Sequence, residues 1–234
     1  MSVHSVPTSP AELIDLLDAT AQDAGAYEAA VRGVVRALAA PGGKVDRKAI
    51  DAEQHRVHGL AWIATYAETL RQVAAWAARL EADGAFGETE QLLAKLVASE
   101  YAAQLAGGLP MTQVEMIRPA DFDLPPPPVR LKASAADKAR LAALLKDGRG
   151  KATVEVTGLD PEFEMVRDQF RKYADAKVVP FAHQWHLKDE LIPLSVLEDL
   201  GAMGVFGLTL PEEYGGAGMG KTAMCVVSEE LSRG

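Results

Sequence analysis

Glycine is concentrated in one short stretch of the chain, and such clusters can either cradle a phosphate or form a tight turn. The stretch is LTLPEEYGGAGMG, Leu208 to Gly220. Its glycines do not follow the Gly-x-Gly-x-x-Gly order of a dinucleotide-binding loop, and no strand–turn–helix unit surrounds them. Pro211 fixes the entry of the chain, glycines supply backbone angles that other residues resist, and Lys221 opens a helix. The residues alone predict a tight turn that leads into a helix.

Two pairs of histidines have a spacing that could contribute to a metal site. His55 and His58 are three residues apart, and His183 and His186 repeat this spacing with Trp185 between them. Residues three apart lie on adjacent parts of one helix surface, but a metal site needs further ligands. No Glu-x-x-His motif or Cys/His cluster supplies them. We therefore predict polar residues beside buried stripes and assign no metal ligand.

The remaining reactive side chains give no stronger signal. Cys225 is the only cysteine, so it forms no internal disulfide, and we predict a small buried residue on a helix. Arg167, Arg171 and Lys172 are expected to face solvent or acidic neighbours. No Gly-x-Ser-x-Gly elbow or Walker loop is present. No residue is assigned a catalytic, cofactor-binding or metal-binding role.

Composition narrows the class of protein. The formal net charge is −9, which argues against a general nucleic-acid binder because such proteins need cations to neutralise phosphates. No apolar run reaches about 18 residues, so no membrane span is expected. The start, MSVHSVPTSP, lacks the charged and apolar regions of a signal peptide. These features predict a cytoplasmic protein with a mainly α fold, since alanine is abundant and aromatic residues make up only 6%.

Residues 1–118 are predicted to form a helical extension. Ser9 is expected to cap a first helix that starts at Pro10, and APGG at Ala40–Gly43 stops a second helix over about 24–38. One long helix is predicted over about 47–81, and another over about 88–106. Long amphipathic helices with short connections favour a bundle of antiparallel neighbours.

A change of composition marks a second segment, residues 119–158. Pro125 to Pro128 lack amide donors and cannot sit inside a helix, so they predict an extended, stiff linker. A ligand for an SH3-type domain is a less favoured alternative. A short helix over about 135–145 and a possible strand over 153–156 follow.

A second helical block covers residues 159–234. Asp160 is expected to cap a helix whose first turn contains Pro161. Pro180 is expected to kink or end this helix and to start the next piece, and Pro193 to begin a further short helix. The buried positions predicted for the first helix are Phe163, Val166, Phe170, Tyr173 and Val178. Those predicted for the last helix are Ala223, Val226, Val227, Glu230 and Leu231.

Three quoted segments of this block resemble the amino-terminal helical domain of acyl-CoA dehydrogenases. They are MVRDQFRKYADAKVVPFAHQW (165–185), LIPLSVLEDLGAMGVFGLTLPEEYGGAGMG (191–220) and CVVSEELSRG (225–234). Their order and spacing make the signal specific, and it covers about a third of the chain. The resemblance identifies the glycine-rich turn as a family signature that serves backbone geometry, not phosphate binding. It implies the helical amino-terminal domain of that fold, preceded here by a bundle extension.

The extension carries a second resemblance. HRVHGLAWIATYAETLRQ (55–72) and SEYAAQLAGGLPMTQVEMIRP (99–119) look like the extension of the family branch that oxidises (2S)-methylsuccinyl-CoA to mesaconyl-CoA. The resemblance implies an acyl-CoA substrate, FAD as cofactor, electron-transfer flavoprotein as electron acceptor, and a homodimer or homotetramer. In such enzymes a glutamate removes the α proton while the β hydrogen leaves as a hydride to the flavin. Another short branched acyl-CoA is the alternative substrate.

The sequence also departs from the family pattern. The middle β domain that grips FAD and the carboxy-terminal helical domain that supplies the base have no counterpart in these residues. Glu212, Glu213, Glu229 and Glu230 lie in the amino-terminal signature, so none of them is the catalytic glutamate. We expect the amino-terminal part of a longer enzyme, inactive alone, with FAD held mainly elsewhere. The alternative from another class is a non-catalytic helical scaffold or regulatory module.

Overall fold

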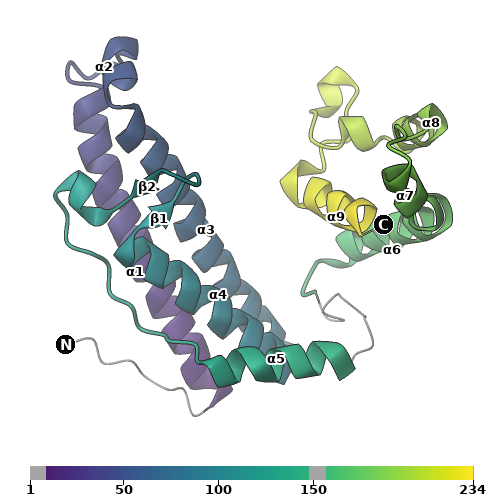
Figure 1. Ribbon diagram of the computed structural model, residues 1–234, viewed down its shortest axis with the longest axis horizontal. Coiled ribbons are helices and arrows are strands. Elements are labelled where there is room, and N and C mark those ends of the chain that lie inside the picture. Colours follow the sequence, from purple (N-terminus) through teal and green to yellow (C-terminus); the bar gives the residue numbers. More distant parts are fainter. Residues whose placement is uncertain (1–8, 148–156, 234) are drawn as a thin grey trace. The chain divides into compact units, whose positions relative to one another are not determined.

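The computed structural model describes residues 9–147 and 157–233, and it confirms the predicted mainly α fold (Figure 1). The chain divides into two compact units, residues 1–158 (unit 1) and 159–234 (unit 2). The further division at residue 118 stays a prediction. The possible strand at 153–156 lies outside the described residues.

Unit 1 is built around three long helices that pack along one another: α1 (Pro10–Ala39), α3 (Gln54–Ala82) and α4 (Glu88–Gly107) (Figure 1). The hydroxyl of Ser9 accepts a hydrogen bond from the Glu12 amide and caps α1 as expected. The core between these helices contains many alanines, whose small side chains allow the helix backbones to approach closely. The fully or nearly fully buried examples are Ala24, Ala77, Ala94, Ala98 and Ala102.

Two helix boundaries in unit 1 differ from those predicted. The expected break before residue 24 is absent, because Ala24 and Tyr27 are buried in the core and their packing holds Gly25 inside the helix. The expected long helix from residue 47 is interrupted at Glu53, whose ψ of 25° is not helical. It separates α3 from α2 (Arg47–Ala52), a short helix that has no buried residue.

A small hairpin closes one side of unit 1. Its strands β1 (Leu109–Pro110) and β2 (Met116–Ile117) are antiparallel, and the 3-10 turn η1 (Pro119–Phe122) follows. Ile117 is 1% exposed and lies against Gly59 of α3. A Cβ at Gly59 would lie 2.5 Å from Ile117 Cγ1. The hairpin can dock closely because this helical position has no side chain.

Replacing Gly59 with alanine is expected to destabilise unit 1 by about 1–3 kcal/mol, because the added methyl group overpacks the contact with Ile117. The matched control is Gly33→Ala on α1, where a Cβ would meet no atom within 4 Å. The control should stabilise the helix by about 0.5–1 kcal/mol. Urea unfolding followed by circular dichroism measures both. Equal effects of the two substitutions would contradict the close packing.

The proline-rich segment belongs to unit 1 and lies against its long helices. Its residues Pro125–Pro128 lie outside any helix or strand, and Leu131 is completely buried in the core. The guanidinium of Arg130 pairs with Asp23 of α1. The next helix, α5 (Ala135–Asp147), contacts α4. Three ion pairs join these two helices: Lys95–Asp137, Lys138–Glu100 and Arg140–Glu88.

Unit 2 contains four α-helices among its described residues: α6 (Pro161–Lys177), α7 (Val179–Leu187), α8 (Leu194–Ala202) and α9 (Gly220–Ser232). The 3-10 turns η2 (Val205–Gly207) and η3 (Glu212–Tyr214) connect α8 to α9. Helix α6 packs against α9 (Figure 1). The buried core of unit 2 combines residues of α6, α8 and α9 with one residue after η2: Phe170, Val196, Leu200, Ala223, Val227 and Leu208.

Two predictions for helix α6 of unit 2 differ from the structure: its N-terminal cap and its buried face. Asp160 occupies the N-cap position of α6, but its side chain makes no capping hydrogen bond there. The fully buried face of α6 consists of Arg167, Phe170 and Ala174. The predicted apolar positions Phe163, Val166 and Tyr173 are only partly buried against the core. An arginine belongs to this face because a carboxylate on α9 pairs with it, as described below.

Candidate functional site

The glycine-rich turn of unit 2 is held by its own backbone. The amides of Ala217, Gly218 and Met219 donate to the carbonyls of Gly207, Leu210 and Leu208, respectively, each at 2.9 Å. These amides are therefore satisfied within the turn and do not point together at an external anion. The geometry agrees with a tight turn and argues against a phosphate cradle.

Glycine is required in this turn for two separate reasons. Gly215, Gly218 and Gly220 have φ values of 78°, 62° and 75°, which residues with a Cβ rarely adopt. At Gly216 the reason is space: an added Cβ would lie 2.2 Å from the Leu210 carbonyl oxygen. The turn brings the segment after η2 back beside α9.

The substitution Gly216→Ala is expected to open this turn and destabilise unit 2 by about 1–3 kcal/mol, because the methyl group collides with backbone. A suitable control is Gly201→Ala on α8, where the nearest atom to an added Cβ is 3.7 Å away. The control should be neutral or stabilising, since alanine favours a helix. Thermal unfolding of both variants measures the difference. A Gly216→Ala protein as stable as the control would show that the turn relaxes freely.

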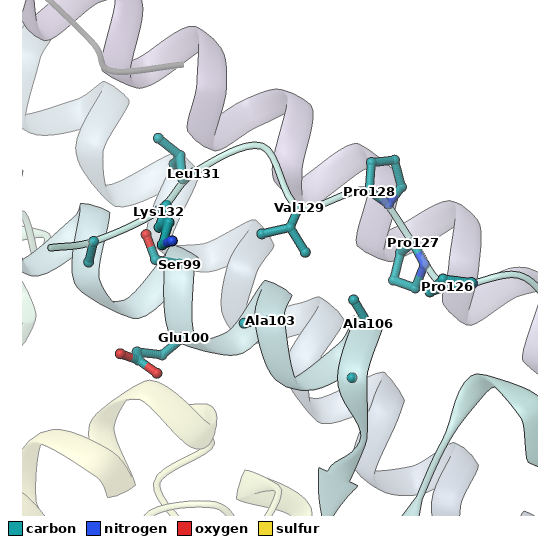
Figure 2. Close-up of a pocket in the computed structure, with 12 residues that line it drawn as sticks. Ser99, Glu100, Ala103, Ala106, Pro126, Pro127, Pro128, Val129, Leu131 and Lys132 are labelled. Carbon is teal, nitrogen blue, oxygen red and sulfur yellow. The ribbon is translucent and has the colours of Figure 1, made fainter. Parts of the chain in front are cut away.

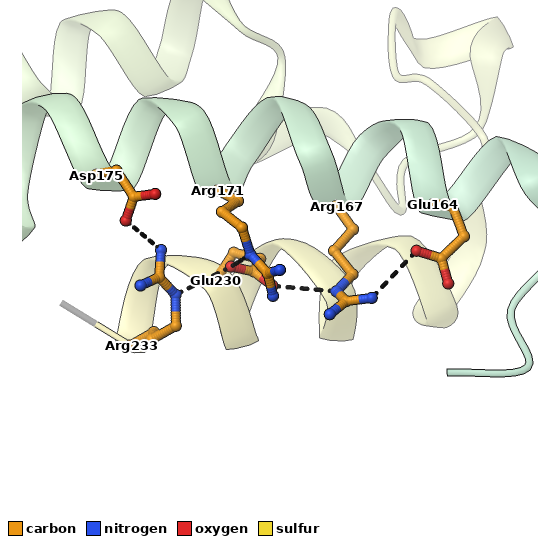
Figure 3. Close-up of polar contacts among 6 residues, drawn as sticks. All are labelled: Glu164, Arg167, Arg171, Asp175, Glu230 and Arg233. Atoms are coloured by element: carbon orange, nitrogen blue, oxygen red, sulfur yellow. Dashed lines mark hydrogen bonds and ion pairs between the residues drawn. The ribbon is translucent and has the colours of Figure 1, made fainter. Parts of the chain in front are cut away.

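The most buried charged group of unit 2 is the carboxylate of Glu230 on α9, which is 1% exposed (Figure 3). Arg171 of α6 donates to both of its oxygens, at 2.7 and 3.0 Å. Arg167, also buried, donates at 3.3 Å, and Arg233 at 3.2 Å. Glu164 and Asp175 accept hydrogen bonds from Arg167 and Arg233 and complete the network.

This network keeps Glu230 ionised. Burial by itself would raise the pKa of Glu230, but hydrogen bonds from Arg171 and Arg233 outweigh it and hold the pKa below its ordinary value. The same pairing raises the pKa of Arg171. A carboxylate stabilised in its charged form is a poor proton acceptor near neutral pH. Glu230 therefore joins α9 to α6 through ion pairs, and its pairing makes it a poor proton acceptor.

The histidines in unit 1 make contacts with protein groups. His55 Nδ1 lies 3.0 Å from Glu115 Oε1, which connects α3 to the hairpin. His58 Nε2 accepts a hydrogen bond of 2.9 Å from the Trp62 indole. Across residues 9–147 and 157–233, no group of three or more His, Cys, Asp and Glu side chains could hold a metal ion. His183 and His186 on α7 are exposed.

The prediction for Cys225 was wrong, because its side chain is exposed on α9. The buried positions of this helix are Ala223, Val226, Val227 and Glu230. A residue two positions from Ala223 and from Val227 is turned about 200° around the helix axis and falls on the opposite face. The periodicity predicted the buried face of α9 correctly, and it also places Cys225 outside it.

Unit 2 exposes an unusual amount of apolar surface around α7, α8 and the glycine-rich turn. The exposed fraction is 91% for Leu191, 66% for Phe206 and 74% for Tyr214. Other exposed apolar side chains in this part of the chain are Phe181, Leu187, Ile192, Leu194, Leu197 and Leu210. Large exposed apolar patches mark surfaces that contact another protein or a ligand.

The described residues of unit 2 offer no vacant buried donor for a flavin. Among buried side-chain atoms of the described chain, only the Tyr27 hydroxyl lacks a hydrogen-bond partner, and Tyr27 belongs to unit 1. Burial and the nearby charge of Asp121 raise the pKa of Tyr27 to about 12. The polar groups of the Glu230 network satisfy one another.

None of the described helices combines the length and the apolar character needed to cross a membrane.

Comparison with known proteins gives several matches that cover less than half of the chain. Residues 160–234 match the family model described as acyl-CoA dehydrogenase, N-terminal domain. The chain is 38% identical over 78 residues to glutaryl-CoA dehydrogenase of Desulfococcus multivorans. It is 34% identical over 105 residues to the mitochondrial short-chain specific acyl-CoA dehydrogenase of Rattus norvegicus. These matches cover 32% and 44% of the chain.

A much longer match relates the chain to the (2S)-methylsuccinyl-CoA dehydrogenase of Cereibacter sphaeroides. The two sequences are 52% identical over 200 residues, or 82% of this chain. The match is longer than unit 2 and so includes most of the extension. The chain spans 36% of this relative and 20% and 25% of the other two. Together with the helical architecture and the signature turn, these matches show that residues 160–234 belong to the acyl-CoA dehydrogenase N-terminal domain family.

Proposed function

We propose that this chain is the amino-terminal part of a flavin-dependent acyl-CoA dehydrogenase that oxidises (2S)-methylsuccinyl-CoA to mesaconyl-CoA. The single observation that carries the proposal is the 52% identity to a (2S)-methylsuccinyl-CoA dehydrogenase over 82% of the chain. The shorter matches cover 78 and 105 residues, whereas this one covers 200 and includes most of the extension. Similarity in the extension favours this substrate over those of other family members.

The exposed apolar surface of unit 2 supports a role as one layer of a larger protein. Leu191, Phe206 and Tyr214 are mostly exposed, and large exposed apolar patches are typical of surfaces that contact another protein. Covering these side chains with further polypeptide would remove their apolar area from water, at about 25 cal/mol for each Å². In the proposed enzyme this polypeptide also holds FAD and supplies the catalytic base.

The partners of the proposed enzyme follow from the reaction. The substrate is an acyl-CoA whose short branched acyl group ends in a carboxylate, so its pocket must admit a negative charge and exclude long chains. Bound FAD would supply the chemistry of hydride acceptance. Electron-transfer flavoprotein is the proposed electron acceptor, a homodimer or homotetramer the proposed assembly, and the cytoplasm the proposed location.

A chimera tests the proposal directly. Residues 1–234 replace the aligned segment of the Cereibacter sphaeroides enzyme, and the unmodified enzyme is the control. We expect the chimera to contain flavin and to oxidise methylsuccinyl-CoA faster than isobutyryl-CoA or butyryl-CoA, because this segment is compatible with that enzyme. Reduction of an electron-acceptor dye measures the rates. A flavin-loaded chimera that prefers butyryl-CoA would contradict the proposed substrate.

The alternative is a non-catalytic helical scaffold or regulatory module. The mass and colour of the protein from its natural source separate the two proposals. A species near 24.9 kDa without flavin absorbance would support the scaffold. A clearly larger yellow protein would support the enzyme.

A further inference from the structure

An open cavity of about 800 Å³ lies in unit 1 between helix α4 and the proline-rich segment (Figure 2). Its floor is the small-residue face of α4, which includes Ala103, Ala106 and Gly107. Its wall is the extended chain from Pro126 to Ala133. Figure 2 shows Val129 pointing from this wall toward α4. A cavity of this volume with mainly apolar lining is typical of sites for small organic ligands.

The wall of this groove is stiffened by its prolines and anchored just after them, so the groove does not depend on a ligand to form. Proline fixes its own φ angle, which stiffens the segment Pro125–Pro128. Leu131 is completely buried and anchors the chain just beyond the prolines. Arg130 binds Asp23 of α1 between the prolines and this anchor. A preformed site avoids the entropy cost of ordering the chain on binding.

Charge distinguishes one end of the groove from the other. Lys132 and Ser99 lie together at one end, whereas Ala106 and the prolines lie at the other (Figure 2). Lys132 is exposed, and no ion pair joins it to another residue in the described ranges. Glu100 also lines the groove, but its carboxylate lies 2.6 Å from Lys138 Nζ and is neutralised. The polar end therefore carries an excess of positive charge.

We propose that this groove binds an amphipathic carboxylate, with the apolar chain along α4 and the carboxylate beside Lys132. From Ser99 to Gly107 the helix rises by about 12 Å, which sets the length of chain that fits. Apolar contacts with Val129 and the prolines supply affinity, and the ammonium group of Lys132 selects the charge of the head group. The site lies wholly within unit 1, and it extends beyond the proposed dehydrogenase function.

Decanoate is a suitable probe because its extended chain has a comparable length. The 234-residue protein is titrated with decanoate, decanol and decylammonium, and binding is measured by calorimetry and by the methyl resonances of Val129. We expect decanoate to bind most tightly and to shift these resonances. Equal binding of decanol, or tighter binding of decylammonium, would overturn the selection for a carboxylate.

A substitution at Lys132 and a matched control test whether the carboxylate of decanoate binds beside this lysine. Lys132→Gln should weaken decanoate binding about 2- to 5-fold, the size expected for an exposed ion pair, and leave decanol binding unchanged. Lys146→Gln, on the exposed surface of α5, is its matched control and should change neither. Equal decanoate affinity of these two variants would overturn the role of Lys132.

Ala103→Trp should fill the groove and reduce decanoate affinity by more than tenfold, whereas Ala143→Trp on exposed α5 should leave it unchanged. Circular dichroism establishes that the variants are folded, and Ala106→Leu replaces Ala103→Trp if that variant does not fold. Decanoate binding that survives blockage of the groove, or leaves the Val129 methyl resonances in place, would overturn the site. These readouts require no enzymatic activity, so they are independent of the proposed dehydrogenase reaction.

Discussion

The substitution Glu230→Ala is expected to lower the free energy of unfolding of unit 2 by about 3–5 kcal/mol, the usual effect of removing one partner of a buried ion pair. The reason is that Arg167 is 7% exposed and would lose its buried carboxylate partner. The remaining hydrogen bond to Glu164, at 3.2 Å, lies toward the surface. Urea unfolding monitored by circular dichroism measures the loss.

The adjacent Glu229 provides a matched control, because it is exposed on the same helix. Glu229→Gln should change stability by no more than about 0.5 kcal/mol. Glu230→Gln keeps the shape of the side chain and isolates the contribution of its charge. If Glu230→Ala were as stable as the Glu229 control, the network would contribute nothing to the attachment of α9 to α6.

The dependence on pH provides a second check. The folded-state pKa of Glu230 is lowered from its ordinary value of 4.5, so the stabilising contribution is present above that value. It is lost as the pH falls toward and through the lower, folded-state pKa. The stability difference between the wild type and Glu230→Gln should therefore be full near pH 7 and shrink in acid. A difference that is constant from pH 7 to acid would contradict an ionised, paired carboxylate.

Leu131→Ala is expected to destabilise unit 1 by about 2–5 kcal/mol, because it leaves a cavity where a completely buried side chain stood. It should also release the proline-rich segment from α4, since Leu131 is the anchor of that wall. Urea unfolding measures the first effect, and protease cleavage within residues 125–134 measures the second.

The control for this prediction is Leu145→Ala on α5, where the side chain is 42% exposed. It removes the same atoms from a site that remains in contact with water, so its cost should be below about 1 kcal/mol. A Leu131→Ala protein that resists proteolysis as well as this control would show that other contacts hold the segment. In that case the groove would keep its shape without Leu131.

Local signals in the sequence were sufficient for most helices and for the signature turn. Helix formation follows from apolar residues at helical spacing and from caps such as Ser9, which act within a few residues. The turn at Leu208–Gly220 was predicted because glycine and proline restrict the backbone locally. The resemblance of residues 159–234 to the acyl-CoA dehydrogenase family also depended on the order of these local pieces.

Local sequence signals gave the wrong helix boundaries at positions where tertiary packing determines the backbone conformation. The residues near Gly25 do not predict that α1 continues through it, because the contacts that offset the low helix propensity of glycine come from the core of the bundle. Glu53 lies among good helix formers, yet the helix breaks there. Helix α2, which precedes the break, has no buried residue whose packing would keep it continuous with α3. Propensity is a weak preference that tertiary contacts outweigh.

The sequence by itself therefore determined the helical class, the turn and the family of residues 160–234, since each depends on neighbouring residues. Only the tertiary structure brought Glu230 to Arg167, which lies 63 positions away in the chain, and made this arginine part of a buried face. Only the tertiary structure placed the proline-rich segment against α4 and thereby formed the groove. The physical reason is that burial and charge pairing depend on distances in space, which the spacing of residues along the chain does not specify.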